Sequence, residues 1–181
     1  MGPPKFTGLI FCIGNLLGSE VIKTMNRLID KYTYHLQQGE IQAAYKGILE
    51  FIGKLRADII KKYPHYDIGS LYQGYMDMSY FSVSTKTLKD KGLKFAIVYL
   101  HAKKSFEIWL SARNRDIAKR YESILKSNIS DSITVFHDDN NQDAIIEYTL
   151  TSTPDFEEQA SLIKIIEQGI EKFVTAINNL L

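Results

Sequence analysis

Two carboxylates stand in stretches of sequence that are otherwise apolar enough to form buried strands. Asp77 and Glu107 are these two residues, and Tyr75 and Trp109 stand two positions from one or the other. Carboxylates are rarely buried unless they are paired or hydrogen-bonded. Arg113, which follows the second stretch, is a cationic candidate for such a pair. We therefore predict that these five residues form the candidate ligand-binding site.

Three kinds of chemistry suit this set. The first is a structural ion pair at a sheet edge, with Arg113, Arg115 or a lysine as the cation. The second is a small-molecule cleft, because such pockets combine apolar walls with a few convergent polar groups. The third is a metal-dependent hydrolase or nuclease, in which Asp77 and Glu107 together would hold Mg²⁺. The catalytic residues and any cofactor stay open at this point.

Other metal chemistry has weaker support. The four histidines are scattered and do not pair at the helical spacing of zinc ligands, so no metal site is predicted from them. In the acidic loop over residues 137–143, Asp139, Asn141 and Asp143 match the first ligand positions of an EF-hand loop. However, Ala144 replaces the required glycine and Leu150 the closing glutamate. We interpret this loop as a solvated turn.

Helical spacing dominates the N-terminal third of the chain. From about Ser19 an apolar stripe recurs at intervals of three and four residues, and Gly39 is suited to end that helix. A second helix follows over residues 41–63 and ends before Pro64. Because the connecting turn is short, we expect the two helices to pack as an antiparallel pair.

The rest of the chain predicts strands and further helices. Strands are expected over residues 71–83, 93–101 and 105–111, the last two as a hairpin, and we place Asp77 and Glu107 on the same, less apolar sheet face. A helix capped by Asn114 runs to about Leu125, and strands follow at residues 133–136 and 144–150. A last helix starts at Thr153, Pro154 and Asp155. The fold class is α+β, with an N-terminal helix pair, a mostly antiparallel sheet of about five strands and a C-terminal helix.

Length and charge limit the classes of protein. The 181 residues are enough for one domain, and we expect an irregular or appended segment over residues 1–24 and a single α+β domain over residues 25–181. A net charge of +1 gives no strong signal for nucleic acid or for a membrane surface. The apolar run at residues 6–17 is shorter than the roughly 20 residues of a membrane span. The single cysteine excludes an intrachain disulfide.

Two resemblances bear on function. The first is carried by Tyr72, Gly74, Tyr75, Met76, Asp77, Met78, Tyr80, Phe81, Lys94, Ala96, Ile97, Val98 and residues 106–110. With these residues, the chain from Met25 to the C-terminus is similar to a family of small bacterial proteins known as a domain of unknown function. This resemblance implies a cytoplasmic bacterial-type protein and supplies no activity.

The element order also resembles the core of the PD-(D/E)xK restriction-endonuclease-like families. Here Trp109 occupies the position of the catalytic lysine, and Asp77 lies one strand early.

The sequence therefore favours a non-catalytic cytoplasmic domain that binds a small molecule or a protein partner. The alternative is a metal-dependent hydrolase or nuclease that uses Asp77 and Glu107. A pure interaction protein, in which the helix pair docks a partner, is a third candidate, and an unusually apolar outer face on the helix expected over residues 41–63 would favour it.

Overall fold

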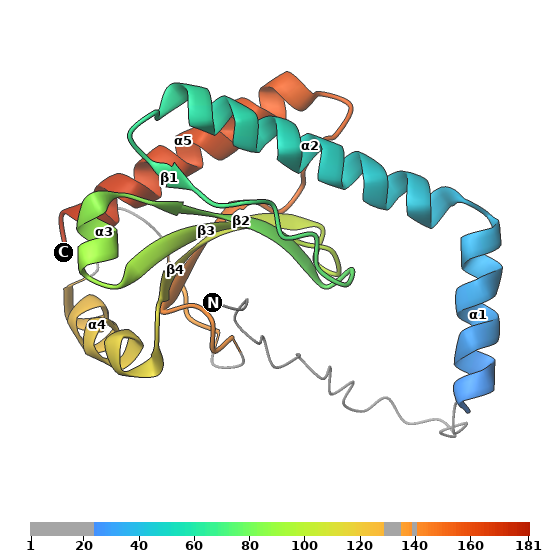
Figure 1. The fold of residues 1–181 in the computed structure, drawn as a ribbon, viewed down its shortest axis with the longest axis horizontal. Helices are drawn as coiled ribbons and strands as arrows, with labels where there is room; N and C mark the ends of the chain where they lie inside the picture. Colours follow the sequence, from blue (N-terminus) through green and yellow to red (C-terminus); the bar gives the residue numbers. More distant parts are fainter. Residues whose placement is uncertain (1–23, 129–134, 139–140) are drawn as a thin grey trace. The chain divides into compact units, whose positions relative to one another are not determined.

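The computed structural model describes residues 24–128, 135–138 and 141–181. These residues form five helices and five strands (Figure 1). The chain divides into two compact units, Met1–Ile48 and Leu49–Leu181, which are treated separately below. The elements are α1 (Met25–Gln37), α2 (Glu40–Lys62), β1 (Asp67–Ile68), β2 (Met78–Ser84), α3 (Lys86–Asp90), β3 (Leu93–Leu100), β4 (Ser105–Ala112), α4 (Arg115–Asn128), β5 (Ile146–Thr151) and α5 (Gln159–Asn178).

The five strands form one sheet in the order β1-β2-β3-β4-β5, and every neighbouring pair is antiparallel. β3 lies at the centre, and its side chains are buried on both faces, as its unbroken apolar sequence predicts. The predicted α+β fold class, with two N-terminal helices, an antiparallel sheet and a C-terminal helix, is confirmed.

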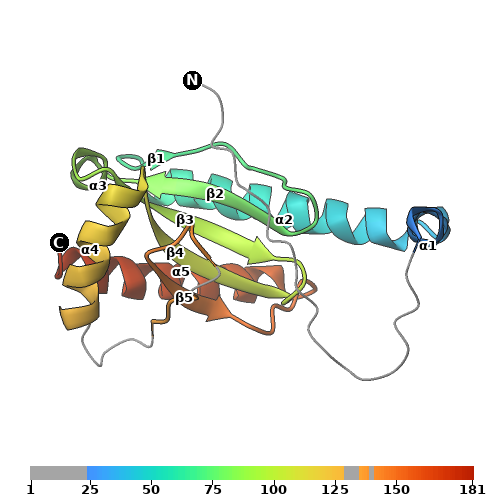
Figure 2. The same ribbon diagram turned by 90° about the horizontal axis from the view of Figure 1, so that it is seen from below.

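Two helices cover one face of the sheet, which we call the helix face. The part of α2 from Leu49 onward and α5 both lie on it, whereas α4 lies on the opposite side, near the end of β4 (Figures 1 and 2). The helix-face core is rich in aromatic rings: Phe51 contacts Phe106, and Phe95 contacts Phe173. The opposite sheet face, which we call the outer face, carries the polar residues discussed below.

Helix ends follow the local chemistry of the sequence. The Asn114 side chain accepts a hydrogen bond from the amide of Ile117 at 2.9 Å, which confirms the predicted cap of α4. Gly39 adopts a φ of +75° at the turn between α1 and α2, again as predicted. Thr24 caps α1 by accepting from the Arg27 amide. The expected start of the first helix near Ser19 lies outside the described residues.

Two predicted element boundaries are wrong. The strand expected from residue 71 begins only at Met78, because Gly74 and Met76 adopt positive φ angles and turn the chain. The last helix begins at Gln159 instead of Thr153, because the Asp155 carboxylate accepts from the amides of Glu157 and Glu158 in a turn. A short helix, α3, also forms between β2 and β3, where no helix was predicted.

The N-terminal unit shows no buried interface between the first two helices. No residue of α1, or of α2 up to Ile48, is buried. The antiparallel pairing of the two helices stays a prediction.

Of the strand predicted at residues 133–136, Val135 and Phe136 are described, and Phe136 pairs with Glu147 as an isolated bridge.

Candidate functional site

Glu107 and Trp109 lie together on the outer face, as the alternation of β4 predicts. The indole Nε1 of Trp109 donates to Oε2 of Glu107 at 2.7 Å, and both side chains are buried. Lys103 lies 3.9 Å from the other carboxylate oxygen, but its side chain is more than half exposed. The principal partner of the Glu107 carboxylate is therefore a neutral donor from its own strand.

A second buried carboxylate, Glu147, lies beside this pair on β5. Glu147 is opposite Trp109 in the strand register and is only 2% exposed. Its carboxylate accepts hydrogen bonds from the side-chain amide of Asn141 and from the backbone amide of Asp138, the latter at 2.8 Å. Burial raises the pKa of Glu147, opposed by those two hydrogen bonds and reinforced by the nearby charge of Glu107.

Glu147 was not among the residues predicted from the sequence. The feature that could have identified it is the same as for Glu107, a lone carboxylate inside an otherwise apolar strand. The expected solvated turn before β5 is wrong for Asn141, which is buried because it bonds to Glu147. Together these contacts attach the connection between α4 and β5 to the outer face, where Ala144 packs against Ala96, Val98 and Trp109.

Tyr75 and Asp77 lie in the turn before β2 and are exposed, Tyr75 by 91%. Asp77 Oδ1 accepts from the Tyr75 amide at 3.0 Å, and the Asp77 carbonyl accepts from the His101 amide. The prediction that Asp77 shares a face with Glu107 is wrong. The register aligns Tyr80, Val98 and Glu107 across the sheet, so the strand position of Asp77 has the opposite parity.

Arg113 is exposed beyond the end of β4, where its amide donates to the Gly92 carbonyl at 2.8 Å. Asp77 contacts His101, at the other end of β3, so the length of this strand separates Asp77 from Arg113. The structure thus brings together Glu107 with Trp109, and Tyr75 with Asp77, but not all five residues. Among the described residues no group of three His, Cys, Asp or Glu side chains is arranged to hold a metal ion.

Ser79 and His101 have the spacing of a nucleophile and its base, because Oγ lies 2.9 Å from Nε2. However, the Ser79 hydroxyl donates to the Gln73 carbonyl at 2.5 Å, and the side chain is completely buried. Burial lowers the pKa of His101, an effect that the charge of Asp77 opposes. Ser79 is therefore not accessible to a substrate, and its hydroxyl proton is already donated. We interpret it as a structural link between β2 and the β3–β4 turn.

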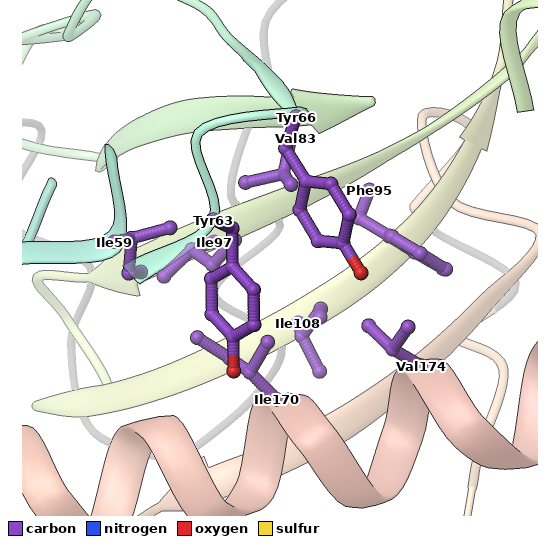
Figure 3. A pocket seen from close by; sticks show the side chains of 9 residues that line it. All are labelled: Ile59, Tyr63, Tyr66, Val83, Phe95, Ile97, Ile108, Ile170 and Val174. Carbon is purple, nitrogen blue, oxygen red and sulfur yellow. The ribbon is translucent and has the colours of Figure 1, made fainter. Parts of the chain in front are cut away.

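An apolar hollow lies on the helix face between the end of α2, the sheet and α5 (Figure 3). Its volume is about 10 Å³, which is the space of about one water molecule. The rings of Tyr63 and Tyr66 stack at 5.0 Å, and the Tyr63 hydroxyl donates to Glu171 on α5 at 2.7 Å. Burial, then this bond, raises the pKa of Tyr63 to about 12. The hollow and the outer-face carboxylates lie on opposite faces of the sheet.

Among the residues that the structure describes, the largest set of exposed apolar side chains is on α1. Residues 24–48, which we call the N-terminal arm, contain no buried residue. Met25 is 71% exposed, Ile29 50% and Tyr32 62%. With Leu28 and Leu36 they recur at the helical spacings i, i+3, i+4, i+7 and i+11, and we call these five residues the apolar stripe of α1.

Comparison with known proteins gives a family. No curated protein and no solved structure matches the chain. Within the described residues, no helix is long and apolar enough to cross a membrane. Residues 25–181 match the family described as "Domain of unknown function (DUF7000)", a range that begins at the first residue of α1 and extends to the last residue of the chain. The predicted resemblance to a domain of unknown function is thereby confirmed, and the chain belongs to the DUF7000 family.

Proposed function

We propose that this protein is an interaction domain that binds another protein chain through the apolar stripe of α1. The observation that carries the proposal is that a helix with a distinct apolar face buries none of its residues. Isolated helices shorter than about 12–15 residues are marginal in water. The 13 residues of α1 therefore need a packing surface, and an exposed apolar stripe of this kind is typical of a protein interface.

The family match supports the proposal. The matched range includes the whole of α1, so the helix is part of the family's domain. The stripe also has the residue types of an interface core, because Tyr32 and Met25 belong to the types enriched there. A small-molecule site has less support, since the hollow on the helix face holds about one water molecule. The outer-face carboxylates accept hydrogen bonds from their own chain.

A photo-crosslinking amino acid tests the proposal when it is placed at Tyr32, in the cells that make the protein. Tyr75 provides the matched control, because it is also a tyrosine and is more exposed than Tyr32, but lies in the turn before β2. We expect one discrete crosslinked protein, identified by mass spectrometry, from position 32 and none from position 75. Crosslinks from position 75 alone would indicate that the partner binds at the turn before β2 and not at α1. No crosslink from position 32 would overturn the proposal.

A further inference from the structure

We propose that the partner of the apolar stripe is a second copy of this chain, so that two N-terminal arms pair. This inference rests on the proposed function, since it names the partner of the same surface. A two-fold interface uses the same surface patch on both partners. A single apolar stripe per chain is therefore sufficient for both sides, and pairing leaves neither stripe exposed.

The charge of the arm is compatible with self-association. Residues 24–48 contain three cationic side chains and two anionic ones, which gives a net charge of +1 with His35 neutral. Two copies therefore repel each other weakly, and an excess of one positive charge is too small to favour an anionic partner such as nucleic acid. The charged residues of the arm are Arg27, Asp30, Lys31, Glu40 and Lys46.

The area of the stripe suits a weak, reversible dimer. A tyrosine side chain has on the order of 150–250 Å² of surface, and the Met, Leu and Ile side chains are taken at the lower end of that range. The exposed fractions of Met25, Leu28, Ile29 and Tyr32 then amount to on the order of 400 Å² per copy. Two paired stripes would bury at most about 800 Å² of this surface, which is in the range of weak, transient interfaces and below a standard interface of about 1,600 Å².

The helix provides an internal control for the test. Tyr32 and Tyr34 are both tyrosines of α1 and are 62% and 60% exposed. At 100° per residue they point in directions about 200° apart, so only Tyr32 belongs to the stripe. Because neither is buried, neither substitution removes core packing, and Tyr32→Ser differs from Tyr34→Ser only in the helix face that it changes.

Sedimentation velocity of the full chain over a range of concentrations tests the inference. We expect a reversible dimer of twice the 20.7 kDa chain mass that forms below a chain concentration of about 1 mM. Tyr32→Ser and Ile29→Ser should raise Kd by at least about tenfold, and Tyr34→Ser should leave it unchanged. A chain that remains monomeric up to about 1 mM, or a dimer weakened equally by both tyrosine substitutions, would overturn the inference.

The crosslink from position 32 separates this inference from the proposed function. A product of twice the chain mass supports both. A product that contains a different protein leaves the proposed function standing and overturns self-association. A monomer in sedimentation together with no crosslink overturns both, because the stripe then has no protein partner.

Discussion

Glu107 and Glu147 each receive hydrogen bonds from neighbouring residues of the same chain. For Glu107 the donor is the Trp109 indole, two residues along the same strand, and for Glu147 it is Asn141 and the Asp138 amide. A buried carboxylate that loses its donor keeps the full cost of desolvation. These residues therefore have a structural role that can be measured without knowledge of any ligand.

Trp109→Phe should lower the free energy of unfolding by about 1.5–3 kcal/mol beyond the effect of the smaller ring. The reason is that the substitution leaves the Glu107 carboxylate buried without its 2.7 Å donor. A double-mutant cycle with Glu107→Leu, which removes the acceptor, isolates the interaction from the change in ring volume when it is measured by urea unfolding. Additive effects of the two substitutions would show that the indole does not stabilise the carboxylate.

Glu147 should make the stability of the protein depend on pH. Because burial raises its pKa above 4.5, its contribution is fully present below pH 4.5 and is lost as the pH rises through the folded-state pKa. The free energy of unfolding of the wild type, relative to Glu147→Gln, should therefore fall as the pH rises above about 4.5. Urea unfolding at several pH values measures this difference, and a difference that increases with pH would contradict the prediction.

At the scale of elements, strand register decided which predicted residues meet. The alternation of β4 correctly placed Glu107 with Trp109, because β4 is a regular strand. The same reasoning was wrong for Asp77, since the chain before Met78 is a turn and not a strand. The alternation of side chains assigns a residue to a sheet face only where the backbone is extended. The positive φ at Met76 was not recognisable from the sequence.

Glycine marks that turn and provides a prediction for it. Gly74 has a φ of +73°, and a Cβ at this position would overlap the carbonyl oxygen of Met78. Gly74→Ala should therefore lower the free energy of unfolding by more than about 1 kcal/mol. Gly53→Ala is the control in α2, where a Cβ meets nothing within 4 Å, and it should raise stability by about 0.5–1 kcal/mol. Thermal unfolding of both variants measures the contrast, and equal shifts would refute it.

Helix boundaries show the same limit of local reasoning. Asn114 and Gly39 were predicted correctly because each satisfies a local backbone requirement. The start of α5 was not, because Phe156 packs against Phe51 and Tyr99 while Asp155 holds a turn before the helix. Contacts between distant parts of the chain override a helix-start signal, and a single sequence does not contain them.

At the scale of the whole molecule, the division of the chain bears on how it unfolds. Sequence predicted a single domain over residues 25–181, which we retain as a proposal, supported by the family match over that range. The chain nevertheless divides at Ile48 into two compact units. Of the residues that the structure describes, the buried apolar ones belong to the second unit, from Phe51 onward. Most of the free energy of folding should accordingly arise there.

Removal of residues 1–38, compared with removal of residues 1–23 alone, tests that conclusion. Because no residue of α1 is buried, the chain that starts at residue 39 should lose little apolar burial relative to the chain that starts at residue 24. Its melting temperature at low protein concentration should be lower by less than about 4 °C, the shift that about 1 kcal/mol causes in a domain of this size. Self-association should be lost in the same variant, since the stripe is absent. A large fall in melting temperature would mean that α1 packs against the second unit in solution. The stripe would then be part of the core of the single domain, and no surface would remain on it for a partner.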